Sequence, residues 1–326
     1  MDLTTKYAGL ELKNPIIVGS SNLTDTVEKI VNCEKNGAGA VVIKSLFEEQ
    51  IMYDVDSQRV NNMFNTYTDT ENYVSFYTKQ HNVQTHLDLI KGAKDKTNLP
   101  IIASINCVSD GEWTSFAKKI QDAGADALEL NMFIMPADEN MLGQEIENTY
   151  FNIISKVLKN ITIPVTLKIN SYFSGLANFI QRLSKTEIKG IVLFNRFYSP
   201  EIDLDTEKIT SSHIYSSPYE NSQVLRWLGI MSPKVSCDLA ASTGIHSGQD
   251  IAKNILAGAN ATQVVSALYL NGVEYISTML QDLEKYMQSK NYSSISDFKG
   301  KLNQKSVKRP MVYERAQFMK YFSDSK

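Results

Sequence analysis

Polar side chains that could bind or activate a ligand recur at the ends of short apolar runs in this sequence. Asn131 ends a run that begins at Ala127, and Lys168 lies within a run that begins at Val165. Because an unpaired ammonium is costly to bury, we expect Lys168 to have a partner. It could hold an anion, form a Schiff base, stabilise the electron-rich edge of a reduced flavin, or belong to a structural ion pair. Comparable positions are held by Ser20, Lys44, Ser45, Asn106 and Asn195.

The loop that follows Asn131 contains no group suited to proton transfer. Residues 132–136 read Met-Phe-Ile-Met-Pro, and none of these side chains takes or gives a proton at neutral pH. If this strand end belongs to a catalytic site, the acid or base must come from elsewhere. Cys107 is one candidate, although its position also suits a buried structural cysteine. His213, Ser171 and Tyr172 are further candidates.

Eight short apolar runs must position these side chains, and segments with helical spacing lie between several of them. The runs are near-continuous rather than alternating, which is typical of parallel strands covered on both faces. They are Ile16–Val18, Ala40–Ile43, Ile101–Ile105, Ala127–Leu130, Val165–Ile169, Gly190–Phe194, Lys234–Cys237 and Thr262–Val265.

A similar short motif stands between an expected helix and the next expected strand three times, at residues 36–40, 122–126 and 256–260. Each segment has a Gly-Ala pair where a helix is expected to end and a short loop leads into a strand. Eight such β/α units in roughly 250 residues predict a (β/α)8 TIM barrel. A doubly wound open sheet is the alternative, but no Gly-x-Gly-x-x-Gly follows the first run.

The barrel prediction accounts for the whole chain as one domain, residues 1–326. Residues 1–12 are expected to form an N-terminal hairpin against the barrel floor. The C-terminal extension is expected to be helical, with a peripheral tail over about residues 300–326 that includes the basic stretch Lys305–Arg309. Such a charged stretch is more typical of a solvated or interface surface than of a ligand site.

Two loops at the mouth of the predicted barrel have the composition of a phosphate site. Barrels often bind phosphate with the loops after strands seven and eight, through backbone N–H groups and a helix N-terminus. Here Thr243 and Gly244 follow the seventh run, and Val265 and Ser266 follow the eighth. Two small-residue turns without a ligand remain the alternative.

The composition is ordinary for a soluble globular enzyme, with 43% hydrophobic and 21% charged residues and a net charge of −3. That charge gives no reason to expect nucleic acid or an anionic membrane as a partner. The three cysteines and four histidines lack metal-ligand spacing, so no metal site is expected. Without a signal-like N-terminus or a long apolar segment, we expect a cytoplasmic protein.

The order of these short motifs along the chain resembles that of the dihydroorotate dehydrogenases. The likeness covers nearly the whole chain, up to residues 294–298, which are similar to the ending of the class 1 enzymes. The matching motifs are Asn14-Pro15, Gly19-Ser20-Ser21, Lys44-Ser45, Glu129-Leu130-Asn131, Lys168, Asn195, Thr243-Gly244-Ile245, Ser247-Gly248-Gln249-Asp250 and Ser266-Ala267-Leu268. The resemblance implies a barrel that binds FMN.

Carried over residue by residue, the resemblance implies a set of flavin and substrate contacts. Lys168 matches the lysine near flavin N1, and Asn61 matches a pyrimidine-binding asparagine. The cofactor-binding positions implied are Ser20, Lys44, Ser45, Asn106, Asn131, Lys168, Thr243, Gly244, Val265 and Ser266. The substrate-binding positions implied are Lys44, Asn61, Asn131 and Asn195.

The chain departs from the family pattern where the family removes a proton from dihydroorotate. The family motif after the fourth strand reads Asn-Leu-Ser-Cys-Pro-Asn, with Cys or Ser as the base. Here Ile134 stands at the base position and Pro136 at a substrate asparagine. Losing a general base costs about 10²–10⁴ in rate unless another group reaches the proton. FMN binding is therefore a firmer prediction than dihydroorotate oxidation.

Three hypotheses for the function follow. The first is an FMN-dependent oxidoreductase that transfers hydride at flavin N5 and acts on dihydroorotate, in pyrimidine biosynthesis, or on another small cyclic compound. The second is a flavin-binding homologue without turnover of dihydroorotate, and the third is an aldolase barrel that uses Lys168. The resemblance also implies a homodimer, and the absence of an iron–sulfur cysteine cluster means that any electron-transfer subunit would be a separate protein.

Overall fold

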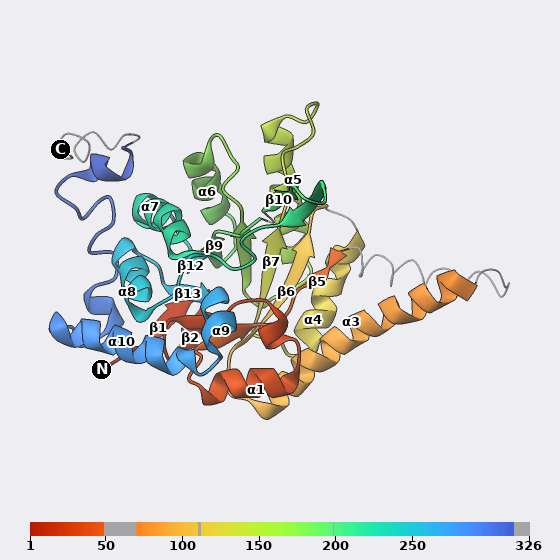
Figure 1. Ribbon diagram of the computed structural model, residues 1–326, viewed down its shortest axis with the longest axis horizontal. Coiled ribbons are helices and arrows are strands. Elements are labelled where there is room, and N and C mark those ends of the chain that lie inside the picture. The colour runs from red at the N-terminus through yellow and green to blue at the C-terminus, as the bar shows by residue number, and fades with distance from the viewer. Residues whose placement is uncertain (49–69, 110–111, 198, 316–326) are drawn as a thin grey trace.

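The computed structural model describes residues 1–48, 70–109, 112–197 and 199–315, and these form a closed parallel barrel (Figure 1). The eight barrel strands are β3 (Ile16–Val18), β4 (Ala40–Val42), β6 (Ile101–Cys107), β7 (Ala127–Met132), β8 (Val165–Ile169), β9 (Gly190–Leu193), β12 (Asp238–Ser242) and β13 (Ala261–Val264). They pair in the order β4-β3-β13-β12-β9-β8-β7-β6, and β6 closes the ring by pairing with β4. The TIM barrel prediction is confirmed.

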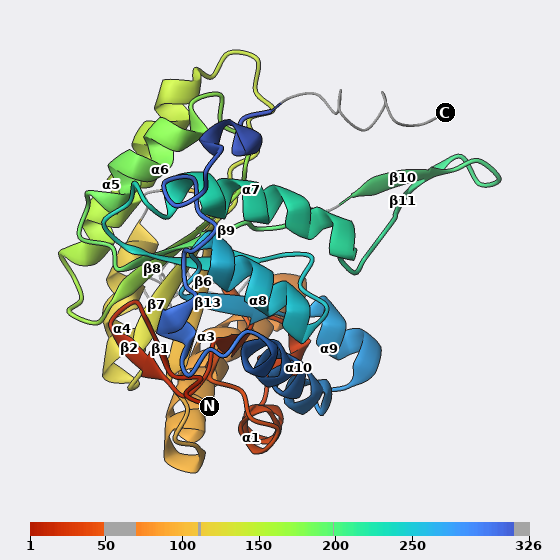
Figure 2. The same ribbon diagram turned by 90° about the vertical axis from the view of Figure 1, so that its left-hand side faces the viewer.

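Helices lie around the barrel and alternate with its strands (Figures 1 and 2). They are α1 (Val27–Lys35), α3 (Thr70–Lys96), α4 (Phe116–Asp122), α5 (Gly143–Leu158), α6 (Leu176–Ser184), α7 (Asn221–Met231), α8 (Gly248–Ala257), α9 (Ser266–Asn271) and α10 (Tyr275–Ser289). The predicted helix ends are confirmed, because Gly37, Gly124 and Gly258 all have φ near +100°. Residues with a Cβ rarely adopt that conformation, so glycine suits these three turns.

One strand prediction is wrong: the seventh strand runs over Asp238–Ser242 rather than Lys234–Cys237. The N–H groups of Lys234 and Val235 instead donate to the carbonyl of Met231 and continue the last turn of α7. The strand itself contains two alanines, so its apolar signal is weak, whereas Val235 and Cys237 made the preceding loop look strand-like.

The barrel floor is closed by the N-terminal hairpin, as expected. Strands β1 (Thr5–Tyr7) and β2 (Leu10–Leu12) pair antiparallel. The ring of Tyr7 is fully buried among inward-facing side chains of the barrel. The N–H of Ala8 donates to the carboxylate of Asp238, and the hydroxyl of Thr5 donates to the carbonyl of Asn260. These contacts fix the hairpin against the ends of two late strands.

The alternation of side chains along each strand separates the barrel interior from an outer hydrophobic layer. In β7, for example, Leu128, Leu130 and Met132 pack in the outer layer beneath the helices. Glu129 and Asn131 therefore face the interior. The lower interior is apolar and is filled by Ile17, Val42, Ile102, Val192 and their neighbours.

Two segments lie outside the barrel. The strands β10 (Pro200–Asp203) and β11 (Lys208–Ser211) form a hairpin that projects from the molecule (Figure 2). The C-terminal extension contains α10 followed by the 3-10 turns Ile295–Asp297 and Pro310–Tyr313. No helix among the described residues is both long enough and apolar enough to cross a membrane.

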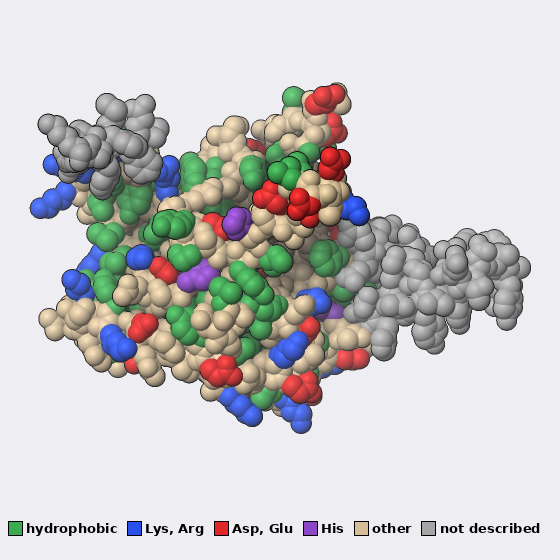
Figure 3. All heavy atoms as spheres, in the orientation of Figure 1, with side chains coloured by type: hydrophobic (Ala, Val, Ile, Leu, Met, Phe, Trp, Pro, Cys, Tyr) green, Lys and Arg blue, Asp and Glu red, His purple; other side chains and the backbone are tan. Residues whose placement is uncertain are grey.

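Hydrophobic side chains also gather on the surface near α9 (Figure 3). Tyr269 and Leu270 of α9 are partly exposed, and the ring of Tyr215 stacks on that of Tyr269 at a centroid distance of 5.7 Å. On the projecting hairpin, Ile202 and Ile209 are 62% and 77% exposed. We call the exposed apolar side chains of this hairpin, Ile202, Leu204 and Ile209, the hairpin surface.

Candidate active site

A row of polar side chains crosses three adjacent strands at the mouth of the barrel. Asn106 of β6 is in register with Asn131 of β7, which is in register with Lys168 of β8. Asn195 follows β9, and its side-chain amide donates to the Oδ1 atom of Asn131 at 2.6 Å. The structure thus brings together four predicted site residues that lie far apart in the sequence.

Lys168 is held by a buried polar network inside the barrel. Its ammonium donates to Oε1 of Gln263 at 2.9 Å, and the amide nitrogen of Gln263 donates to the carboxylate of Glu129. Burial lowers the pKa of Lys168 and raises the pKa of Glu129, and the charge of each group opposes the shift of the other. The orientation of the Gln263 amide fits an ammonium on one side and a carboxylate on the other.

This network leaves donors and acceptors at the barrel mouth. An ammonium has three N–H groups, and the described residues accept one of those on Lys168. The Oδ1 atom of Asn106 is buried and has no hydrogen-bond partner among the described residues. A buried acceptor of this kind calls for a ligand or water. The donors of the Lys168 ammonium and the Oδ1 acceptor of Asn106 together suit the polar edge of a planar heterocycle.

A second row of groups consists of serine hydroxyls on neighbouring strands. Ser45 lies between Ser20 and Ser104, with oxygen–oxygen distances of 2.9 and 2.8 Å. The backbone N–H of Ser45 also donates to the hydroxyl of Ser20. Lys44 is exposed at the same strand end. These hydroxyls can donate or accept, so they suit a ligand with both kinds of group.

The two loops predicted to cradle a phosphate lie together and are bridged by Ser216. The Ser216 hydroxyl accepts the N–H of Gly244, and its own N–H donates to the hydroxyl of Ser266. Thr243 and Gly244 both have positive φ, at 84° and 74°. Val265 precedes α9, and its methyl group fills the space beside Gly19 where a side chain would clash.

These donor groups suit a ligand that joins a flat ring system to an anionic group. The flat ring system would meet the amides of Asn106 and Asn131 and the ammonium of Lys168. The anionic group would meet the Thr243–Gly244 and Val265–Ser266 loops. There the N–H of Gly244 donates to Ser216 and the hydroxyl of Thr243 donates to the carbonyl of Phe194, and both are donors of the kind a phosphate needs.

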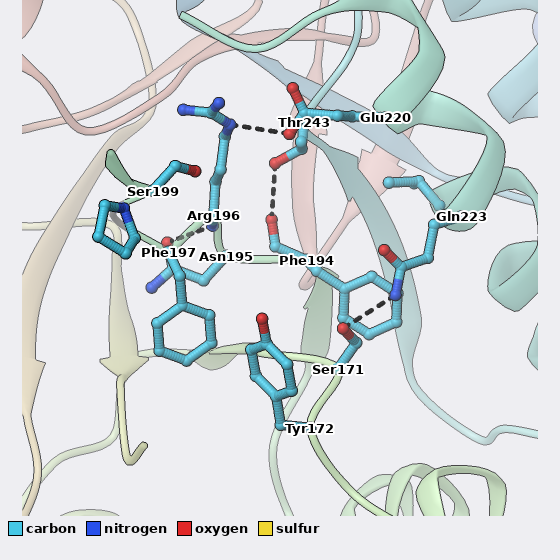
Figure 4. A pocket seen from close by; sticks show the side chains of 12 residues that line it. Ser171, Tyr172, Phe194, Asn195, Arg196, Phe197, Ser199, Glu220, Gln223 and Thr243 are labelled. Atoms are coloured by element: carbon cyan, nitrogen blue, oxygen red, sulfur yellow. Dashed lines mark hydrogen bonds and ion pairs between the residues drawn. The ribbon is translucent and has the colours of Figure 1, made fainter. Parts of the chain in front are cut away.

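The loop after β7 has an apolar, aromatic character. Ile134 packs against the outer hydrophobic layer, and its carbonyl accepts the side-chain amide of Asn170 at 3.2 Å. The ring of Phe133 contacts that of Phe197 at a centroid distance of 4.2 Å, and Phe197 contacts Tyr172 at 4.8 Å. The rings of Phe197 and Tyr172 border a cavity of about 350 Å³ between the ends of β8, β9 and β12 (Figure 4).

Cys107 lies away from this mouth. Its side chain is fully buried in the outer hydrophobic layer, on the opposite face of β6 from Asn106. Burial, with a smaller contribution from the nearby Glu48 carboxylate, raises the pKa of the thiol well above its usual value. A thiol that is buried and protonated is poorly placed to act as a base. Asn61 lies outside the described residues.

Several residues of the site were missed by sequence reasoning. Glu129 and Gln263 received no role, although a charged residue within a continuous apolar strand was a usable signal. Phe133, Phe197 and Arg196 carry no local pattern that marks them, because their contacts depend on how three strand-end loops meet.

Comparison with known proteins gives consistent matches along the chain. A family model described as dihydroorotate dehydrogenase matches residues 2–287. The catalytic subunit of dihydroorotate dehydrogenase B (NAD(+)) of Pyrococcus furiosus is 26% identical over 313 residues, which cover 92% of this chain and 98% of that protein. The corresponding subunit of Thermoplasma acidophilum is 23% identical over 314 residues, with the same coverage. Dihydroorotate dehydrogenase A (fumarate) of Lactococcus lactis is 26% identical over 324 residues, covering 92% and 99% of the two chains.

Proposed function

This chain belongs to the dihydroorotate dehydrogenase family, and we propose that it is an FMN-dependent member whose reaction is hydride transfer at flavin N5. Like the family, it is an oxidoreductase that acts on CH–CH groups. The observation that carries the FMN proposal is the buried Lys168–Gln263–Glu129 network beside the amides of Asn131 and Asn195. An aldolase using Lys168 has no comparable support from the neighbouring residues.

Each part of the chain would have a distinct role toward the cofactor. FMN, when bound, would supply a two-electron acceptor for the substrate. Lys168 would provide positive charge next to the edge of the ring system that becomes electron-rich on reduction. Asn131 and Asn195 would orient the ring and the substrate, because their mutual hydrogen bond fixes both amides. Ser20, Ser45 and the two phosphate loops would hold the remaining polar groups.

Flavin content tests the proposal directly. The purified protein, or the protein reconstituted with FMN, should show flavin absorbance with a stoichiometry near one per chain. Lys168→Met should weaken FMN binding, whereas Lys6→Met, at an exposed position on the N-terminal hairpin, should leave it unchanged. A colourless protein that cannot be reconstituted would exclude the proposal.

Turnover of dihydroorotate is a separate question, because Ile134 stands at the family's base position and faces the outer layer. A homologue that binds flavin without oxidising dihydroorotate is the alternative. Stopped-flow reduction of bound FMN by dihydroorotate distinguishes the two. Rapid reduction would identify a dihydroorotate dehydrogenase, and no reduction in a flavin-loaded protein would favour another cyclic substrate.

We also propose a homodimer that buries the hairpin surface. A large exposed apolar patch commonly marks an interaction site, and Ile202, Leu204 and Ile209 are among the most exposed hydrophobic side chains of the described residues. Light scattering should give a dimer mass for the native chain and a monomer mass for the double variant Ile202→Glu/Ile209→Glu. A matched variant with the exposed Leu302→Glu should remain dimeric.

A separate electron-acceptor protein is proposed on the names of the archaeal relatives, which are catalytic subunits of an NAD(+)-dependent enzyme. Anaerobic reoxidation of the reduced protein by fumarate, compared with its reoxidation by NAD(+), would test this proposal. Reoxidation by fumarate alone at a catalytic rate would contradict the need for a partner.

A further inference from the structure

The cavity at the mouth of the barrel is walled by aromatic rings. Phe194 and Phe197 come from the segment after β9, and Tyr172 comes from the loop after β8 (Figure 4). Phe197 and Tyr172 are tilted by 58° to each other, and Phe133 and Phe197 by 47°. The rings of Phe194, Phe197 and Tyr172 border the same cavity, and aromatic rings in such a wall suit the face or edge of a flat ligand.

The charged groups that line this cavity neutralise each other. Among the described lining residues, Arg196 and Glu220 carry charge, and Nε of Arg196 donates to Glu220 at 2.8 Å. The two terminal nitrogens of Arg196 donate to the backbone carbonyls of Ile214 and His213. The guanidinium is therefore engaged in holding the loop at residues 213–220. An anionic ligand would lose its hydration here without gaining a free cation.

Polar groups are nevertheless present at defined points of the cavity. Tyr172 points its hydroxyl into the space between the rings of Phe194 and Phe197 (Figure 4). On the far wall, the amide of Gln223 donates to the hydroxyl of Ser171 at 2.9 Å. A phenol hydroxyl is a good donor to a carbonyl oxygen. The cavity thus offers apolar faces and one directed donor.

We propose that this cavity binds the ring of an uncharged, flat, conjugated carbonyl compound, with Phe197 against the ring face and Tyr172 donating to the carbonyl. This inference rests on the proposed flavin-dependent function and gives its substrate class. A conjugated carbonyl compound contains the C=C bond that an oxidoreductase acting on CH–CH groups forms or reduces. A ring that carries a carboxylate, as dihydroorotate does, suits this cavity less well.

Binding of a matched pair of probes to the FMN-loaded protein tests the proposal. The uncharged probe is coumarin, and the charged one is coumarin-3-carboxylate. Both can be titrated by isothermal calorimetry and by perturbation of the flavin absorbance band. We expect coumarin to bind at least about ten-fold more tightly than its carboxylate. Phe197→Ala should weaken coumarin binding about ten-fold, and Tyr172→Phe should weaken it several-fold.

A matched control variant and a measurement of flavin content separate failure of this inference from failure of the proposed function. Tyr219→Ala removes an aromatic ring that is 89% exposed and does not line the cavity, so it should leave coumarin binding unchanged. Tighter binding of the carboxylate, or equal binding of coumarin to native protein and Phe197→Ala, would overturn the proposal. The flavin content of each variant is measured first. Loss of flavin from the native protein would refute the proposed function, whereas a wrong probe ranking with flavin retained would refute this inference alone.

Discussion

Lys168, Gln263 and Glu129 are buried inside the barrel, with Lys168 next to its mouth, whereas Phe133, Tyr172 and Phe197 lie on loops that water reaches. Every group of the first set depends on its neighbours, because a buried charge without its partner is costly. The second set is held by ring contacts on loops whose ends are fixed by strands. Substitutions in the loops can therefore alter the ligand while the interior network stays intact. This contrast explains how a chain can retain the cofactor side of a site and differ on the substrate side.

The largest expected effect is a loss of stability when the buried Lys168–Gln263–Glu129 network is broken. Lys168→Met should lower the free energy of unfolding by about 3–5 kcal/mol, since it leaves the buried carboxylate of Glu129 uncompensated. Urea unfolding of the flavin-free protein measures this loss. The double variant Lys168→Met/Glu129→Gln removes both charges and should recover most of the stability. Equal losses in the single and double variants would contradict the idea of a coupled pair.

The buried side chain of His86 should make the stability of the protein depend on pH. Nε2 of His86 is buried with no partner among the described residues, and burial lowers the pKa of His86 to about 4. The unfolded chain takes up this proton near pH 6.5, but the folded protein does so only near pH 4. Stability should therefore fall as the pH drops from 6.5 to 4, by up to about 3 kcal/mol from this group. His86→Leu should flatten that part of the stability–pH profile. An unchanged profile would show that His86 does not cause this loss of stability.

A smaller effect is expected on the reduction potential of the flavin-loaded protein. The Glu129 carboxylate raises the pKa of Lys168 against the effect of burial. Glu129→Gln removes this support, so the ammonium should lose its proton more easily and stabilise the reduced cofactor less. We expect the midpoint potential to fall by about 30 mV, equivalent to about 1.4 kcal/mol for two electrons. In a Lys168→Met background, Glu129→Gln should cause no further fall; an equal fall there would show that Glu129 does not act through Lys168.

The smallest effect is expected in the loops. Tyr172 is 55% exposed, so Tyr172→Ala should change the free energy of unfolding by no more than about 0.5 kcal/mol. Urea unfolding under the conditions used for Lys168→Met makes the comparison direct. A loss near that of Lys168→Met would show that the loops and the interior are one cooperative unit.

The barrel could be predicted from the sequence because its strands are buried on both faces and read as continuous apolar runs. The seventh strand was misplaced because Ala240 and Ala241 signal burial weakly. The amides at the strand ends could also be predicted, since a polar residue that ends an apolar run is a local pattern. The hydrogen bond between Asn131 and Asn195 confirms that two of these positions meet.

The remaining parts of the site depend on contacts that no local pattern encodes. Gln263 and Glu129 are 134 residues apart in the chain, and only the closed barrel brings them together. The aromatic cavity depends on three loops whose relative positions follow from strand register and loop length. Arg196 illustrates the difficulty, because a cation near a site suggests an anion, whereas here Glu220 already neutralises it.

The N-terminal hairpin has a consequence for how the protein is made. Its contacts with Asp238 and Asn260 span 230 and 255 residues, and Asp2 bridges to Ser294. The hairpin is therefore synthesised before the barrel strands but cannot dock until most of the barrel has been synthesised. Until then the barrel floor stays open and its apolar interior is accessible to other chains. Contacts of such long range slow folding, so the nascent chain should depend on protection from aggregation until its last strands emerge.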